Sequence, residues 1–296
     1  MRPLRITLGY ASLTGPRPRN EDFCGAVTPE GAELESKGIL AAVADGVGGH
    51  ANGREAAEYT VRGLLSDYYA TPDTWAVNKS LDTVLDALNR WLVSHAARNR
   101  ETAGMATTLS AIVLRGRRFY LAHVGDSRIY RLRGGRLEQL STDHVWEHPE
   151  LDNVLSRAVG LDAHLSVDYA DGELEAGDVF ALMSDGVWSP LGEKRIAAIL
   201  RAEADPQEAA SRLAMGAEDG GSQDNCTALV LRIDDLPPDR LRDNIDRLHR
   251  LPLPPRLKPG HQIDGLTVDT VLHESIATLL YRVRDAQGHA RVLKTL

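Results

Sequence analysis

Short apolar runs alternate with turn-forming residues along most of the chain, and this pattern predicts a fold rich in strands. The run Ile39–Ala44 is apolar throughout and ends at Asp45 in a glycine-rich turn, which is typical of a buried strand. Other segments with strand character are predicted at residues 4–10, 20–27, 105–114, 119–126, 129–140 (a hairpin), 178–186 and 223–231.

Apolar residues recur at helical spacing in two segments after the central turn, residues 57–68 and 81–92, which predicts two amphipathic packing helices. Asp205, Pro206 and Glu208 indicate the start of another helix. Residues 143–165 are less regular and are expected to form a loop or short helix over a site. Their histidines, including His144, share no regular spacing, which favours surface or capping roles over metal ligation.

Aspartates stand repeatedly at the ends of predicted strands. Asp45, Asp126 and Asp185 follow apolar runs, and Asp224 begins one. Antiparallel strands in stacked sheets would bring these four carboxylates to one edge, where like charges repel unless cations lie among them. Taken alone, the Asp45–Gly46 pair is explained as well by a turn or a helix cap. The recurrence of the pattern favours a metal site.

Oxygen ligands alone select hard cations such as Mg²⁺ or Mn²⁺. Two such ions can hold a water between them, lower its pKa and direct it at phosphorus, which is hydrolysis of a phosphate ester. An arginine fork would bind the phosphoryl oxygens, and both Arg17 and Arg19 precede the acidic pair Glu21–Asp22. Adjacent residues of a strand face opposite ways, so at most one acid of this pair points directly into the site.

Charge and composition narrow the possible partners. The formal net charge is −8, and the acidic excess belongs to residues 1–235, since residues 236–296 carry more basic than acidic side chains. This balance argues against nucleic acid as a partner. Two cysteines are too few for a disulfide framework, and no apolar run is long enough for a membrane span. We therefore expect a cytoplasmic protein that does not associate with a membrane through this chain.

Six motifs occur in an order that resembles the metal-dependent PP2C-type (PPM) serine/threonine phosphatases, most closely the bacterial branch. The resemblance covers residues 5–234. The motifs are Arg-Pro-Arg-Asn-Glu-Asp at 17–22, Val-Ala-Asp-Gly-Val-Gly-Gly-His at 43–50, Ala-Thr-Thr-Leu at 106–109, Val-Gly-Asp-Ser-Arg at 124–128, Leu-Met-Ser-Asp-Gly-Val at 182–187 and Gln-Asp-Asn-Cys-Thr at 223–227.

The resemblance implies an α+β fold, a four-layer α-β-β-α sandwich of two antiparallel sheets flanked by helices. It also implies two Mn²⁺ or Mg²⁺ ions and a phosphorylated protein as substrate. Asp45 would bridge the ions, and the Gly46 carbonyl would bind one of them. Asp185 and Asp224 would bind the second ion, and Asp126 together with Asp185 would bind a weaker third ion. Arg17 would bind the phosphate. Glu21 and Asp22 would contact the ions through metal-bound waters.

One departure from the family pattern concerns the leaving group. Some members carry His directly after the Asp-Gly pair, whereas this chain has Val47, and His50 is out of register. We therefore expect a metal-bound water to protonate the departing oxygen. Ala106 replaces a usual Gly, which we expect to be tolerated, and residues 143–165 match the variable flap.

The predicted division of the chain is a phosphatase domain (1–235), a helix with a proline-rich linker (236–260) and a β-rich segment (261–296). The last segment resembles the start of a protein-kinase N-lobe, with Lys294 at the ATP-contacting position. His273, Ser275 and Thr278 stand where glycines are expected. A kinase of the same pathway or fusion is thus an expected partner, and a small β appendage is the alternative.

Two other functions stay open from the sequence. One is a non-catalytic phosphoprotein-binding or scaffold module that keeps the fold, and the intact acids at 45, 185 and 224 count against it. The other is a phosphohydrolase of small phosphoesters, because a metal site alone does not choose the alcohol.

Overall fold

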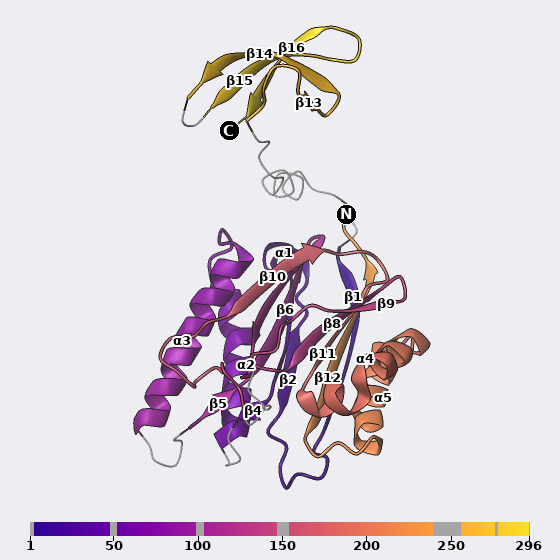
Figure 1. Ribbon diagram of the computed structural model, residues 1–296. Coiled ribbons are helices and arrows are strands. Elements are labelled where there is room, and N and C mark those ends of the chain that lie inside the picture. Colours follow the sequence, from indigo (N-terminus) through magenta and orange to yellow (C-terminus); the bar gives the residue numbers. More distant parts are fainter. Residues whose placement is uncertain are drawn as a thin grey trace. The chain divides into compact units, whose positions relative to one another are not determined.

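Two antiparallel five-stranded sheets form the centre of the larger part of the chain (Figure 1). The computed structural model describes residues 3–47, 52–98, 104–146, 154–238, 256–275 and 278–295. Contacts divide the chain into two units, Met1–Pro238 and Asp239–Leu296, and each is described by itself.

In the first sheet, the strands follow the order β1-β12-β11-β8-β9, and in the second β10-β7-β6-β3-β2. A short ribbon pairs β4 with β5. The strands of this unit are β1 (Arg5–Leu13), β2 (Phe23–Val27), β3 (Ile39–Ala44), β4 (Gly46–Val47), β5 (Ala106–Thr107), β6 (Leu109–Arg115), β7 (Arg118–Val124), β8 (Arg128–Arg133), β9 (Arg136–Gln139), β10 (Asp168–Glu173), β11 (Val179–Met183) and β12 (Cys226–Asp235).

Helix pairs cover the outer faces of both sheets (Figure 1). The pair α2 and α3 packs on the second sheet, and α4 and α5 pack on the first. The helices of the described residues are α1 (Gly31–Ser36), α2 (Asn52–Ala70), α3 (Val77–Arg98), α4 (Asp185–Ala202) and α5 (Pro206–Asp219). The predicted α-β-β-α sandwich is confirmed.

Strand β3 shows why the sandwich forms. All six of its residues are buried. Leu40, Ala42 and Ala44 belong to the core under α2 and α3, whereas Ile39, Ala41 and Val43 belong to the core between the two sheets. Side chains of a strand alternate between its faces, so a strand covered on both faces must be apolar at every position.

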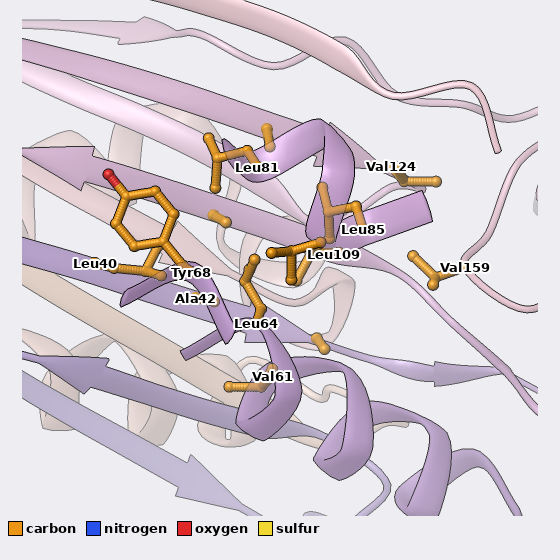
Figure 2. Packing of buried hydrophobic residues seen from close by; sticks show 14 of the residues in the cluster. Leu40, Ala42, Val61, Leu64, Tyr68, Leu81, Leu85, Leu109, Val124 and Val159 are labelled. Atoms are coloured by element: carbon orange, nitrogen blue, oxygen red, sulfur yellow. The ribbon is translucent and has the colours of Figure 1, made fainter. Parts of the chain in front are cut away.

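The core under α2 and α3 is built from long side chains of both helices. Figure 2 shows Leu64 and Tyr68 of α2 and Leu81 and Leu85 of α3 packed over strand residues such as Leu109. These positions are the ones whose helical spacing the sequence displays. A third core lies between the first sheet and α4 and α5, where Leu213 and Ala214 are fully buried.

The structure differs from the sequence prediction in several places, and α1 and β10 were not predicted at all. The strand predicted over 105–114 breaks at Thr108, between β5 and β6. Strand β2 begins at Phe23, so Glu21 and Asp22 precede the strand. Helix α4 was missed because Pro190 and Gly192 interrupt it, and Gly192 (φ 65°) places a kink there.

The second unit contains a four-stranded antiparallel sheet in the order β13-β14-β15-β16. A small core of Leu257, Val268, Tyr281 and Val283 supports it. The strands of this β-rich segment are β13 (Gln262–Ile263), β14 (Leu266–Glu274), β15 (Leu279–Arg284) and β16 (Ala290–Thr295). Lys294 is exposed on β16.

Two of the sequence predictions fall outside the described residues. These are the helix over 239–248 and most of the proline-rich linker. The likeness of the second unit to a kinase N-lobe stays a prediction. None of the helices in the described ranges combines the length and apolar character that crossing a membrane requires.

We predict that a chain ending at Pro238 keeps the stability of the first unit, because the three large cores lie within residues 4–233. All four tryptophans also lie before residue 239, so their fluorescence reports this unit alone. The urea midpoint should match that of the full chain. A clear drop in the midpoint would show that residues 239–296 stabilise the first unit.

His123 on β7 predicts an acid-sensitive contribution to stability. Its Nδ1 lies 3.0 Å from Ser110 Oγ and its Nε2 lies 3.1 Å from Thr142 O. Burial lowers the pKa of His123 to about 4, and the interaction with His144 lowers it further while Asp143 opposes it. The unfolded chain thus takes up this proton near pH 6.5 and the folded chain only near pH 4.

Stability should therefore fall by on the order of 3 kcal/mol from this group as the pH drops from about 6.5 to about 4. The variant His123→Gln should be less stable at pH 7 and should lose less stability over this interval. Urea unfolding at several pH values, followed by tryptophan fluorescence, measures both. Parallel pH profiles for the two proteins would contradict the assignment.

Candidate active site

The topology brings four aspartates to one end of the sandwich. Strands β3 and β7 both pair antiparallel with β6, so they run in the same direction and deliver Asp45 and Asp126 to one edge. In the other sheet, β11 and β12 are antiparallel neighbours, so Asp185 after β11 lies beside Asp224 before β12. Each sheet therefore contributes two carboxylates.

These residues line a cleft of about 840 Å³. Every predicted site residue except Asp22 lies on its wall. The lining residues are Arg17, Pro18, Arg19, Glu21, Asp45, Gly46, Val47, Thr108, Asp126, Val154, Leu155, Ala158, Leu161, Asp185, Asp224 and Asn225.

Backbone bonds to the Thr107–Thr108 pair hold Asp45. The Asp45 N–H donates to Thr108 Oγ1 at 2.9 Å, and the Asp45 carbonyl accepts from Thr107 Oγ1 and from the Thr108 N–H, both at 2.8 Å. Gly46 follows in close contact with α2, where an added Cβ would lie 2.3 Å from the Gly53 carbonyl carbon. Only glycine allows this approach, which keeps the Gly46 backbone at the cleft.

The two adjacent acids take different positions. Glu21 lines the cleft, and its N–H donates to Asn225 Oδ1 at 2.8 Å. Asp22 is 3% exposed, and Ser184 Oγ donates to its Oδ2 at 2.7 Å. Its Oδ1 has no hydrogen-bond partner. Asp22 is thus buried next to Asp185 rather than on the cleft wall.

Burial and mutual repulsion disfavour the charged forms of these acids. Burial raises the pKa of Asp45 well above its usual value, and the charges of Asp22, Asp185, Asp126 and Asp224 raise it further. Burial likewise raises the pKa values of Asp22 and Asp126 to about 7. Four or five carboxylates cannot stay ionised together here unless positive charge lies among them.

The cluster suits a hard divalent cation by its donor set. Asp185 Oδ1 is buried without a hydrogen-bond partner, and burial together with the charge of Asp224 raises the pKa of Asp185. A cation bound by these carboxylates would satisfy that oxygen and remove the repulsion. The side chains on this wall offer oxygen and no sulfur or imidazole, which favours Mg²⁺ or Mn²⁺.

No group of three or more Asp, Glu, His or Cys side chains in the described ranges is arranged so that it could hold a metal ion as it stands. An ion at this cleft therefore needs rotation of the carboxylates, or ligands from backbone carbonyls and water as well.

Arg17 is the cleft arginine that contacts the acidic cluster. Its Nη2 lies 2.7 Å from Asp224 Oδ2, and its Nε donates to the Gln223 carbonyl at 3.0 Å. Its side chain is 51% exposed, so it can turn toward a ligand in the cleft. Arg19 also lines the cleft, and its carbonyl accepts from Asn225 Nδ2 at 2.9 Å.

Sequence reasoning missed several residues that shape the site. Asn225 fastens the segment that carries Arg17 and Glu21, through bonds to Thr14, Arg19 and Glu21. Residues 154–161 contribute an apolar wall to the cleft, in line with the expectation that residues 143–165 lie over a site, although its individual residues were not predicted. The signal for Asn225 is its place directly after Asp224, whereas no periodicity singles out the residues of the apolar wall. His144, for which a surface or capping role was expected, is only 6% exposed and accepts a hydrogen bond from the Gly125 N–H.

Comparison with known proteins agrees with this geometry. Residues 18–215 match the profile of protein phosphatase 2C. The chain is 30% identical over 234 residues to the serine/threonine phosphatase Stp of Listeria innocua, covering 73% of this chain and 90% of that protein.

Solved structures show the same fold. PppA of Pseudomonas aeruginosa superposes with a TM-score of 0.67 at 31% identity, over 78% of this chain and 99% of that one. The catalytic domain of the phosphatase PstP in complex with two manganese ions gives 0.66 at 32% identity, over 78% and 100%. These matches confirm the resemblance read from the motifs, and the chain belongs to the protein phosphatase 2C family of metal-dependent serine/threonine phosphatases.

Proposed function

We propose that this chain hydrolyses phosphoserine and phosphothreonine on proteins, using two Mn²⁺ or Mg²⁺ ions bound in the acidic cleft. The observation that carries the proposal is the meeting of two carboxylates from each sheet in one cleft, with Arg17 beside them. The family and the two manganese ions of the related PstP domain support it.

Asp45, Asp185 and Asp224 would hold the two ions, with the carbonyl of Gly46 as a further ligand. Asp45 comes from one sheet and the other two from the opposite sheet, which suits Asp45 to the bridging position. Asp126, with Asp185, would serve a weaker third ion. Glu21 and Asp22 would act through water, which agrees with the burial of Asp22 behind the cleft wall.

Ions held by these residues would lower the pKa of a water that serves as nucleophile and would stabilise the charge that develops on the phosphoryl oxygens. Arg17 binds and orients the phosphoryl group. A planar guanidinium can donate two parallel hydrogen bonds, which two oxygens of a phosphate group can accept. In the structure the Nε and Nη2 groups of Arg17 are engaged by Gln223 and Asp224, so a phosphate bound by this edge through two bonds would replace both contacts.

The leaving serine or threonine oxygen must receive a proton. Val47 stands on the cleft wall directly after Gly46 and has no proton to give, and no histidine is among the cleft residues that the structure describes. Water in the cleft is therefore the proposed proton donor.

We predict that Asp45→Asn lowers hydrolysis of a phosphothreonine peptide with Mn²⁺ by at least ~100-fold, because it removes one anionic ligand between the ions. The matched control is Asp67→Asn on the exposed face of α2, which should keep full activity. Excess chelator should abolish wild-type activity.

Full activity in chelator would contradict the metal mechanism. Binding of the phosphopeptide without hydrolysis at any Mn²⁺ concentration would favour the scaffold function. Hydrolysis of an aryl phosphate but of no phosphopeptide would favour a small phosphoester as substrate.

Replacement of Arg17 should separate substrate binding from metal binding. Arg17→Ala removes charge-assisted bonds worth about 1.5–3 kcal/mol, so KM for the phosphopeptide should rise by about 10- to 100-fold. The Mn²⁺ concentration needed for half-maximal activity should not rise, because the variant also removes the ion pair between Arg17 and Asp224. Arg19→Ala is the matched control and should change KM little. A parallel loss of substrate and Mn²⁺ affinity would show that Arg17 supports the fold of the site.

A further inference from the structure

The loop after β7 turns sharply to deliver Asp126. Gly125 has a φ of 106°, and an added Cβ would lie 2.6 Å from the Thr108 side chain. Only glycine fits this position. The Asp126 side chain follows directly and lines the cleft. Its position therefore depends on how the Gly125 backbone is held.

A single residue, His144, binds both polar backbone groups of Gly125. The His144 N–H donates to the Gly125 carbonyl at 2.8 Å, and the Gly125 N–H donates to His144 Nδ1 at 3.1 Å. The imidazole is nearly enclosed, with 6% of the residue exposed. Because Gly125 donates to the ring, Nδ1 must be unprotonated.

The opposite ring nitrogen is held by a carboxylate. Nε2 carries the proton of the neutral ring and lies 3.0 Å from Asp168 Oδ2. Arg157 Nη1 lies 3.3 Å from the same nitrogen and donates to Asp168 Oδ1 at 2.9 Å. Asp168 and Arg157 thus fix the tautomer and orientation of His144, as an outer carboxylate does for a metal-bound histidine.

His144 also joins the Asp126 loop to the apolar wall of the cleft. Its carbonyl accepts from the Ser156 N–H at 2.8 Å, and the Trp146 N–H donates to the Val154 carbonyl at 3.0 Å. Val154 and Leu155 line the cleft. His144 therefore links this wall to Gly125.

The other side of Asp126 is fixed by α4. Trp188 Nε1 donates to the Asp126 carbonyl at 3.0 Å. The Arg128 guanidinium lies 3.3 Å from the Trp188 ring centre, and its Nη2 lies 2.7 Å from Asp143 Oδ2. The adjacent pair Asp143–His144 thus holds the loop on both sides of Asp126.

We propose that His144 is a positioning residue for Asp126: through its bonds to Gly125 it sets the place of this carboxylate and couples it to the 154–161 wall. The inference rests on the proposed role of Asp126 as a metal ligand. It assigns His144 no contact with substrate or metal.

Two near-isosteric variants test which ring nitrogen matters. In His144→Asn the side-chain oxygen can take the place of Nδ1 and accept from Gly125, but Asp168 is out of reach. In His144→Gln the amide can take the place of Nε2 and donate to Asp168, but the acceptor for Gly125 is lost. If His144 only filled space, His144→Gln would not impair the site more than His144→Asn.

The measurement is titration of the full chain with Mn²⁺ alone, with free Mn²⁺ followed by electron paramagnetic resonance. His144→Gln should lower the Mn²⁺ affinity of the site that Asp126 serves by about tenfold, whereas the affinity of His144→Asn should stay within about twofold of wild type. Asp126→Asn should weaken the same site. The double variant Asp126→Asn with His144→Gln should be no weaker than Asp126→Asn alone, since positioning an absent carboxylate has no effect.

Additive losses in the double variant, equal losses in the two His144 variants, or normal Mn²⁺ binding by Asp126→Asn would each overturn the proposal. Thermal unfolding without Mn²⁺ shows whether a variant loses its fold, and an equal loss of folded protein in both variants also counts against positioning. Failure of the proposed function is a separate result, namely wild-type protein that hydrolyses no phosphopeptide with Mn²⁺.

Discussion

Repulsion among buried carboxylates is the constraint on which the rest of this structure depends. Asp22, Asp45, Asp126 and Asp185 lie where burial and each other's charge raise their pKa values. Local sequence preferences do not bring these carboxylates together, and the repulsion between them would fall if they moved apart. The scaffold must therefore supply the free energy that keeps them at one end, and a divalent cation is the partner that removes the repulsion.

The three apolar cores supply that free energy. Strand β3 contributes to two of them at once, since alternate residues face the helices and the opposite sheet. Burial of apolar surface contributes about 25 cal/mol per Å². Asp45 directly follows β3, so a strand that is buried at every position delivers one of the clustered carboxylates to the cleft. A rigid strand end holds a ligand more closely than a loop would.

The loops around the cleft are tied down by polar groups rather than by the core. Asn225 fastens the segment with Arg17 and Glu21, Thr108 fastens Asp45, and His144 fastens Gly125. Each bond joins a residue next to the cleft to a neighbour distant in sequence. Such hydrogen bonds fix the positions of side chains, whereas burial of the apolar layers stabilises the fold of the domain.

The sequence by itself determined the layers and the family. Uniform apolar character at 39–44, helical spacing at 57–68 and 81–92, and aspartates at the ends of strands are local patterns, and each reports burial on one or more faces. They suffice to predict buried strands, the helix pair over 57–68 and 81–92 and an acidic cleft, whereas the two stacked sheets flanked by helices follow from the family resemblance. The order of the motifs identified the family.

Only the tertiary structure decided the positions within the site. The burial of Asp22 beside Ser184, the contact of Arg17 with Asp224 and the enclosure of His144 by Gly125 and Asp168 join residues up to 207 positions apart. Helix α4 forms despite Pro190 and Gly192 because packing on the first sheet outweighs their local preference. The pattern of apolar side chains shows which face of a strand is buried. The pairing between strands distant in sequence decides which residues that face contacts.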